Sequence, residues 1–466
     1  MVARYSRDVT TSDNTDPAPD SPESTAEAST PETMDRHGSR KHLENLMAFI
    51  DSAPSPFHAV EVVAGLLADA GFDEADPRQP AVAGRQFLRS GGALLAWDDS
   101  VATAPTSGFR IVGAHTDSPN LRIKPLPEVT SAGFQQLGVE IYGGVLLNSW
   151  LDRDLGMSGR VSLRDGSTPL LAINDPLLRV PQLAIHLDRE ISDKGLHLNR
   201  QKHMVPVWGL GTSEAGDFRS FLAAHLDVEA ADILNWDLML HDLTPSAVFG
   251  ARAEFLAAPR IDNLLSTHAA TTALCHFASV GVSDSPSQVN RSVPVMALFD
   301  HEEVGSVSST GAGSPALATV LERSVIARGG NRDDYHRAIA ASHAVSADGA
   351  HATHPNYAGR HEPEHQIALN EGPVLKTNAN QRYATDADSA RPILLACEQA
   401  NVTVQQFVTR TDLGCGSTIG PLTAATAGIP VVDFGAAQLS MHSAREMSGA
   451  ADPELLAAAL QEYLCK

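Results

Sequence analysis

Strand-like apolar runs alternate with helical periodicities from about residue 251 to the end of the chain. Segments 292–300 (SVPVMALFD) and 429–435 (IPVVDFG) are apolar runs of strand length, whereas 262–280 (DNLLSTHAATTALCHFASV) and 314–329 (SPALATVLERSVIARG) are typical of helices. The same mixture occurs before residue 127, where the apolar run in FRIVGAHTDSPN predicts a strand that ends at Gly113. This order favours an α/β fold, with helices covering both faces of a sheet.

Segment 127–248 differs from the rest of the chain. It contains β-like runs broken by Gly, Asp and Pro, among them 138–151 (GVEIYGGVLLNSWL), 159–173 and 183–191 (LAIHLDREI). We predict an inserted β-rich domain over 127–248, which interrupts a discontinuous α/β domain over 39–126 plus 249–466. Residues 1–38 are rich in Ser, Thr, Pro, Asp and Glu, so we predict a disordered acidic tail.

The net charge limits the kinds of partner, and the cysteines indicate the cellular compartment. The net charge of −22 argues against attraction to nucleic acid or to an anionic membrane. The four cysteines form no CxxC motif and are expected to be reduced thiols of a cytoplasmic protein. No apolar run reaches the roughly 18 residues of a membrane span, and no signal peptide is predicted.

Metal-type side chains recur just beyond apolar runs or at a helix start. In an open α/β sheet, groups at the carboxyl ends of the strands converge on one crevice. We therefore expect residues from distant parts of the chain to share one site. The candidates are His115 and Asp117 in GAHTDSP, Asp262 in PRIDNLLS, Glu302 and Glu303 in FDHEEVGS, Asp348 in SADGAHATHPNY, and His442 in SMHSARE.

Imidazole and carboxylate donors suit Zn²⁺, Mn²⁺ or Co²⁺. One catalytic zinc usually takes three protein ligands, so five ligands with one bridging carboxylate fit two ions better than one. Paired metals can share a hydroxide nucleophile. In an extended segment Glu302 and Glu303 would point to opposite sides, so that one binds metal while the other acts as general base.

Each candidate taken alone has a simpler interpretation. Asp262 before a helical run is typical of an N-cap, a single histidine such as His115 is typically structural or exposed, and a Glu-Glu pair suits a solvated turn. The stretch HEEVG at 301–305 is not an HExxH motif, because the fourth residue after His301 is Gly305. The metal hypothesis therefore rests on the whole set.

In these motifs the chain resembles the aspartyl aminopeptidase family, peptidase family M18. The matching stretches are GAHTDSPNLRIKP, PRIDNL, DHEEVGS, SADGAHATHPNY, GPVLKTNANQRYA, CGSTIGP and MHSARE, in the family's order over about 39–460. The resemblance implies a zinc-peptidase-type central mixed sheet flanked by helices, with the inserted domain mediating dimerisation. It also implies a homo-oligomer, typically a dodecamer built from dimers, that cleaves N-terminal Asp or Glu from peptide substrates.

The resemblance also implies roles for individual residues. Five residues would be ligands of two Zn²⁺ ions per subunit, with Asp262 bridging them: His115, Asp262, Glu303, Asp348 and His442. Glu302 would be the general base for the metal-activated water, and Asp117 would orient His115.

Three further residues, His186, Lys376 and Tyr383, match positions near the family's substrate. His186 in LAIHLDREI matches a histidine that reaches a neighbouring subunit's active site and has also been assigned as a zinc ligand. From the sequence alone, His186 would be a strand residue on a half-buried face. His186 or His354 would stabilise the oxyanion, and Lys376 and Tyr383 would bind the acidic side chain of the substrate.

The chain departs from the family pattern at Gly349, where many relatives carry a larger residue. Because some bacterial members have other preferences, an aminopeptidase of broad or non-acidic specificity is an alternative. A serine hydrolase is disfavoured because no GxSxG motif occurs. The stretch GCGSTIGP lacks the lysine and the spacing of nucleotide-binding loops. A non-catalytic self-assembling scaffold predicts a missing ligand, and none is missing.

Overall fold

The computed structural model describes residues 36–102, 104–280 and 291–465. The chain has two units, of which the second, His37–Lys466, is compact and contains nearly all of the described residues. The disordered tail predicted over 1–38 lies outside the described residues, except that residues 36–38 belong to helix α1 (Arg36–Ser52).

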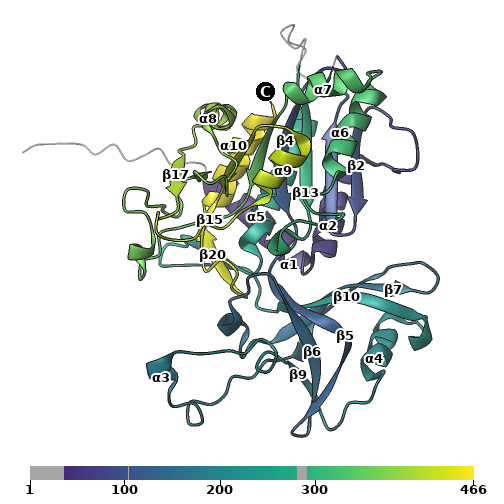
Figure 1. Cartoon of the computed structure of the whole chain (residues 1–466), viewed down its shortest axis with the longest axis vertical. Helices are drawn as coiled ribbons and strands as arrows, with labels where there is room; N and C mark the ends of the chain where they lie inside the picture. The colour runs from purple at the N-terminus through teal and green to yellow at the C-terminus, as the bar shows by residue number, and fades with distance from the viewer. Residues whose placement is uncertain (1–35, 103, 281–290, 466) are drawn as a thin grey trace, which may run out of the picture. The chain divides into compact units, whose positions relative to one another are not determined.

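A mixed sheet forms the centre of the second unit. Its strands are β1 (Asp73–Glu74), β2 (Arg85–Ser90), β3 (Ala93–Asp98), β4 (Phe109–His115), β13 (Val293–Phe299), β14 (His343–Ala347), β16 (Val374–Thr377), β17 (Gln405–Val408) and β18 (Val431–Gly435). They follow the order β1-β2-β3-β13-β4-β14-β18-β16-β17. Figure 1 labels β2, β13, β4 and β17 of this sheet. Strands β13, β4, β14 and β18 run parallel, whereas β3 and β16 are antiparallel to their inner neighbours.

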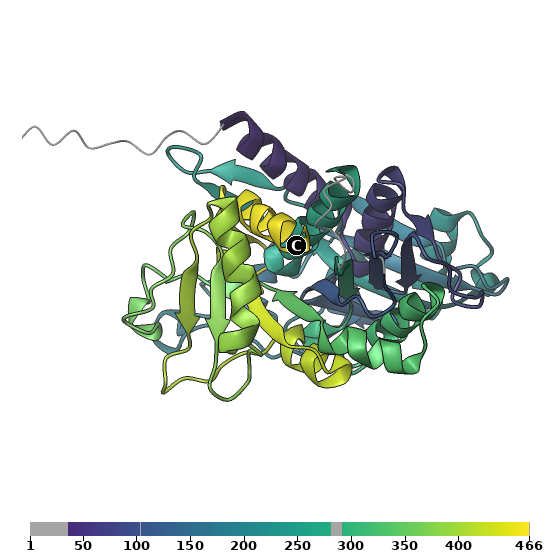
Figure 2. The same ribbon diagram turned by 90° about the horizontal axis from the view of Figure 1, so that it is seen from above.

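Helices cover both faces of this main sheet (Figures 1 and 2). Val112 and Ala114 of β4 belong to the apolar cluster with α1, α2 (Pro56–Asp69), α5 (Ile261–Val280), α8 (Ala387–Ala400) and α10 (Asp452–Leu464). Phe109 and Ile111 belong to the opposite cluster, with α6 (Ala316–Ala327), α7 (Arg332–Ala340) and α9 (Ile419–Ala427). Alternate side chains of one strand thus enter two cores, which confirms the predicted α/β class. In the part of the chain that the structure describes, no helix is both long and apolar enough to cross a membrane.

Local signals set the ends of several elements. Ser55 caps α2, accepting a hydrogen bond from His58 N at 3.4 Å, and Pro56 occupies the first turn. The turn at Gly91-Gly92 joins β2 to β3, with Gly91 at φ 58°. The strand predicted to end at Gly113 continues instead to His115, because Ala114 and His115 still pair with β13.

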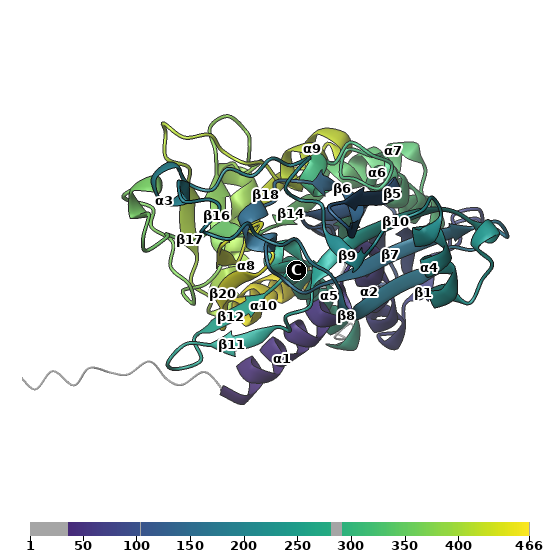
Figure 3. The same cartoon turned by 90° about the horizontal axis from the view of Figure 1, so that it is seen from below.

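A second sheet is made of β5 (Asn120–Ser131), β6 (Phe134–Tyr142), β7 (Leu155–Leu163), β8 (Leu170–Leu178), β9 (Val207–Leu210) and β10 (Ile233–Asp242). The strands are antiparallel in the order β8-β7-β10-β5-β6-β9 (Figure 3). Leu121 and Leu238 pack in its own apolar cluster with Phe218 of α4 (Asp217–Leu226). The sheet starts at Asn120, before residue 127, and the inserted domain over 127–248 stays a prediction. Three short elements complete this region: η1 (Leu147–Trp150), α3 (Ile191–Lys194) and η2 (Ala230–Asp232).

The strand predicted over 183–191 is wrong. His186 lies in a turn closed by a 2.9 Å hydrogen bond from Leu187 N to Ala184 O. The neighbouring Leu183, Ile185 and Leu187 are 57%, 54% and 75% exposed. Alternating apolar residues form a strand when one face is buried, and here these side chains remain exposed.

A small sheet carries two loops toward the edge of the main sheet. It consists of β11 (Ala247–Phe249), β12 (Phe255–Ala258), β15 (Ala350–His351), β19 (Ala437–Leu439) and β20 (Glu446–Gly449), in the order β11-β12-β20-β19-β15. Strand β12 leads directly into residues 259–262, and residues 440–445 connect β19 to β20. These two loops supply Asp262 and His442.

Candidate metal centre

Side chains from distant segments meet at the carboxyl ends of the parallel strands. His115 is the last residue of β4, Asp348 follows β14 directly, and Glu303 follows β13 after a short loop. Asp262 comes from the start of α5, and His442 comes from the turn between β19 and β20. This is the convergence that the strand pattern predicts.

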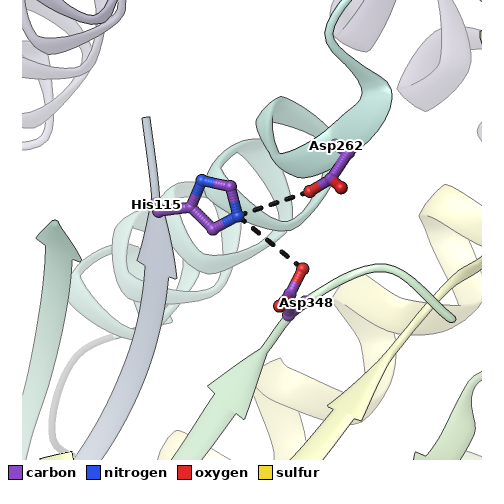
Figure 4. Close-up of side chains that lie close together, drawn as sticks. All are labelled: His115, Asp262 and Asp348. Carbon is purple, nitrogen blue, oxygen red and sulfur yellow. Dashed lines mark ion pairs between the residues drawn. The ribbon is translucent and has the colours of Figure 1, made fainter. Parts of the chain in front are cut away.

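Three buried residues form the first group of candidate ligands. His115 Nε2 lies 3.3 Å from Asp262 Oδ1 and 3.7 Å from Asp348 Oδ1 (Figure 4). One donor atom from each residue lies within 4.8 Å of the others. This spacing is what a shared cation needs.

A second group shares Asp262 with the first. His442 Nε2 lies 3.4 Å from Asp262 Oδ2 and 3.4 Å from Glu303 Oε2. Asp262 thus presents one oxygen to each histidine. Its torsion angles (φ −80°, ψ 106°) are not helical, and the carboxylate lies between the two groups. An N-cap role alone does not describe Asp262.

The adjacent glutamates do not lie in the extended segment that the sequence predicts. They belong to a short 3₁₀ turn, η3 (Glu302–Val304), which follows His301 at φ 64°. The two carboxylates nevertheless diverge, because Glu302 Oε2 lies 3.9 Å from His115 Nε2 whereas Glu303 Oε2 faces His442. The turn, rather than the alternation of a strand, separates them.

Asp117 holds both the first histidine and the glutamate turn. His115 Nδ1 donates to the carbonyl oxygen of Asp117 at 3.0 Å, which leaves Nε2 directed at the carboxylates. The carboxylate of Asp117 accepts hydrogen bonds from the backbone N–H groups of Glu302 and Glu303, each at 3.1 Å. Tyr142 donates to the same carboxylate at 2.7 Å.

The site concentrates negative charge in a buried volume. Burial raises the pKa of Glu302 to about 8, with Asp348 and Asp262 adding to the shift. Burial and the charge of Asp262 likewise raise the pKa of Glu446 to about 8. Burial alone would lower the pKa of His115, but Asp117, Asp262 and Asp348 raise it well above its ordinary value. In the metal-free protein, bound protons relieve the repulsion between the carboxylates. Bound divalent cations would relieve the same repulsion in place of these protons.

Two buried carboxylate oxygens test whether a metal fits. Asp262 Oδ1 and Glu303 Oε1 have no hydrogen-bond partner among the described residues. An unsatisfied buried acceptor is costly, and a cation would satisfy both. The donor set of imidazole nitrogens and carboxylate oxygens is that of zinc sites. Gly144 allows His442 to approach closely, because a Cβ there would lie 3.0 Å from His442 Nδ1, which contacts Gly144 O at 3.1 Å.

A pocket of about 760 Å³ opens over the two groups. Lys376 and Tyr383 line it beside the candidate ligands. Lys376 Nζ donates to Gly349 O at 3.0 Å, lies 3.9 Å from Asp348 Oδ2, and lies 5.1 Å from the centre of the Tyr383 ring. The lysine is only 1% exposed, so the nearby carboxylate of Asp348, rather than solvent, offsets its positive charge. A Cβ at Gly349 would lie 3.0 Å from Gln438 Nε2, so a larger residue there requires Gln438 to move.

Four of the predicted site residues do not line this pocket: the buried His115 and Asp117, and also His186 and His354. His186 sits in its exposed turn. The Nδ1 atom of His354 accepts a hydrogen bond from Asn356 N at 3.2 Å, and its ring centre lies 4.9 Å from that of Tyr357. Within the described structure, His351 of β15 lines the pocket where His354 was expected.

Several residues of the pocket wall have no role predicted from the sequence. These are His351, Asn380, Arg382, Thr418 and Met441. All of them occur in the stretches that carry the family resemblance, SADGAHATHPNY, GPVLKTNANQRYA, CGSTIGP and SMHSARE. The motifs were therefore an available signal, but position in a motif does not show which side chains face a cavity.

Comparison with known proteins places the chain in a family. The family model for aminopeptidase I zinc metalloprotease (M18) matches residues 49–464. "Probable M18 family aminopeptidase 2" of Streptomyces coelicolor is 52% identical over 429 residues, which cover 91% of this chain and 98% of that protein. The protein of the same name from Mycobacterium tuberculosis H37Rv is also 52% identical, covering 90% of this chain and 97% of its own length.

Solved structures share the fold. A chain in the cryo-EM structure of the Ape4 and Nbr1 complex superposes with a TM-score of 0.86 and 35% identity, covering 92% of this chain and 86% of that one. A chain of the S. cerevisiae mApe1 dodecamer superposes with a TM-score of 0.78 and 26% identity, covering 92% of this chain and 97% of that one. The M18 aminopeptidase of Thermotoga maritima superposes with a TM-score of 0.80 and covers 92% of this chain and 97% of its own. At 22% identity it supports the fold alone. The chain belongs to the M18 family of zinc metallo-aminopeptidases.

Proposed function

We propose that this chain is a two-metal aminopeptidase that hydrolyses the N-terminal residue from peptides, with Glu302 as general base. The observation that carries the proposal is the sharing of Asp262. One of its oxygens faces His115 and the other faces His442, so two groups of ligands are joined by one carboxylate. A pair of zinc ions held there would supply Lewis acidity and lower the pKa of a water molecule.

Glu302 is the residue best placed to move the proton. It borders both groups without belonging to either set of three donors, and it lines the substrate pocket. Its carboxylate would accept a proton from the attacking water and deliver it to the leaving amine. Asp117 fixes this carboxylate through the backbone N–H of Glu302.

The preference for N-terminal Asp or Glu rests on Lys376 and Tyr383. A buried ammonium group at the pocket wall is the feature that would attract an acidic side chain in a protein of net charge −22. The same ammonium lies near Asp348, which weakens its pull on a substrate. Broad or non-acidic specificity is therefore the second candidate function.

We extend the proposal to assembly and location. The S. cerevisiae relative is a dodecamer, and a homo-oligomer built from dimers is proposed for this chain, with its inserted domain over 127–248 mediating dimerisation. The exposed Leu183, Ile185 and Leu187 around His186 support a contact there, through which His186 would act in a neighbouring subunit. A cytoplasmic location is proposed on the absence of CxxC motifs.

One experiment tests reaction and specificity together. The purified protein is stripped of metal, reconstituted with Zn²⁺, Mn²⁺ or Co²⁺, and assayed on a panel of aminoacyl anilides that includes Asp, Glu and Leu. Metal-dependent release from free N-terminal residues, with none from N-acetylated controls, is expected. A protein that binds metal but cleaves no member of the panel would support the non-catalytic scaffold instead. Equal rates on acidic and apolar residues would favour the second candidate function.

A further inference from the structure

Glu446 joins the two loops that supply Asp262 and His442. Its Oε2 atom accepts a hydrogen bond from Asp262 N at 2.8 Å, and its Oε1 atom accepts one from His442 N at 2.6 Å. We infer that Glu446 is a positioning residue of the metal centre, which sets the backbone of the shared carboxylate and of the second histidine. This inference rests on the proposed two-metal site.

The position of Glu446 suits this role. It is the first residue of β20, pairs with Ala258 at the end of β12, and is 2% exposed. The chain leaves β12 toward Asp262 and reaches β20 from His442. A single buried side chain, placed where β12 pairs with β20, therefore contacts both loops.

Both loops contain backbone conformations that need support. Arg260 (φ 57°), Ser440 (φ 57°) and His442 (φ 68°) adopt left-handed torsion angles that side-chain-bearing residues disfavour. Neither loop would be held in these conformations by local preference. The two oxygens of Glu446 supply acceptors to an N–H group in each loop.

A positive charge lies near the buried carboxylate. Arg260 and Glu446 line the same small cavity of about 30 Å³. The guanidinium of Arg260 is anchored by a hydrogen bond from Nη2 to Ile50 O at 3.0 Å. Its charge offsets part of the cost of burying Glu446.

The two metal groups should respond differently to loss of this support. His442 belongs only to the group with Asp262 and Glu303. The other group keeps His115, whose ring is held independently by Asp117. Weakening Glu446 should therefore release the metal of the His442 group first.

The test is metal retention in Glu446→Gln. The amide has one acceptor oxygen, and its NH₂ group would face a backbone N–H donor. Zinc content after dialysis should fall from about two to about one per chain, and zinc affinity of the second site should fall roughly 10–100-fold. Retention of two zinc ions at the wild-type chelator-release rate would overturn the inference. If the wild-type protein itself does not bind two zinc ions, the proposed function fails instead.

Asp452→Asn is the matched control. Asp452 is also a fully buried carboxylate that accepts a backbone hydrogen bond, from Asn370 N at 2.8 Å, but it contacts no candidate ligand. It should lose thermal stability while keeping two zinc ions. Zinc loss in this variant equal to that in Glu446→Gln would show that general destabilisation causes the effect.

Hydrogen exchange of the wild-type protein tests the inference without any variant. In the metal-free protein at pH 8, the amide protons of Asp262 and His442 should exchange at least about tenfold more slowly than that of Met441 in the same turn, whose N–H has no hydrogen-bond partner among the described residues. Exchange of all three amides at the same rate would contradict the role of Glu446.

Discussion

Asp262 Oδ2 lies 3.4 Å from His442 Nε2, and this contact joins the start of α5 to the turn before β20. The other oxygen of the same carboxylate faces His115 at 3.3 Å. One buried side chain is thus common to both groups of candidate ligands, and the charge it carries must be compensated in each.

Asp262→Asn is expected to remove metal from both groups. The amide loses the negative charge and one of the two acceptor oxygens, so each group is left with only one carboxylate ligand. Metal analysis of dialysed protein should find less than one zinc per chain. Asp388→Asn, at a carboxylate whose side chain is 90% exposed, should retain the wild-type content. Normal zinc binding by Asp262→Asn would exclude a bridging role.

Glu302→Gln should separate catalysis from metal binding. Because Glu302 belongs to neither group of three donors, zinc content should stay at the wild-type value. Loss of the proton acceptor should lower kcat by roughly 10²–10⁴-fold. The two measurements are kcat on the preferred anilide and zinc per chain; a near-normal kcat would mean that another residue is the base.

Lys376→Met should change specificity. Removal of a charge-assisted hydrogen bond costs about 1.5–3 kcal/mol, so kcat/KM for Asp and Glu substrates should fall by roughly 10–150-fold. The value for a Leu substrate should change little, and the exposed Lys202→Met should affect neither. An equal loss for every substrate would instead indicate that Lys376 acts through its contact with Asp348.

The metal-free protein should lose stability as the pH rises from about 5 to about 8. In the folded state burial raises the pKa of Glu302 and of Glu446 from 4.5 to about 8. The folded chain binds these protons more tightly than the unfolded chain, so their contribution is complete below pH 4.5 and is lost as the pH rises through 8. Zinc would compensate the charge, so the Tm of the zinc-loaded protein should vary less. Thermal scans at four pH values with and without zinc test this, and a rise in the metal-free Tm across the window would contradict it.

Gly435→Ala should destabilise the edge of the site. A Cβ there would clash with the carbonyl oxygen of Asp348, which is backbone and cannot rotate away. Overpacking of this kind costs about 1–3 kcal/mol, and displacement of Asp348 should also weaken zinc binding. Denaturant unfolding and metal analysis measure the two effects. Gly359→Ala, with no atom within 4 Å of its new Cβ, is the control that should change neither.

The local elements could be predicted because their signals lie within a few residues. Ser55 and Pro56 mark the start of α2, and the apolar run over 292–300 marks β13. The prediction for 183–191 failed because Leu183, Ile185 and Leu187 show the alternation of a strand without a buried face. Periodicity reports which side of a segment is apolar, and it does not report whether anything covers that side.

The sequence by itself determined the donor types and their place at strand ends, and so the meeting of His115, Asp348 and Glu303 at one edge of the sheet. Only the tertiary structure decided that Glu302 and Glu303 diverge on a 3₁₀ turn, that His351 lines the pocket in place of His354, and that Glu446 holds both loops. The physical reason is the distance along the chain over which each signal acts. Strand and helix patterns follow from neighbouring residues, whereas distances between side chains depend on how strands pack and on loop torsion angles, which no local pattern encodes.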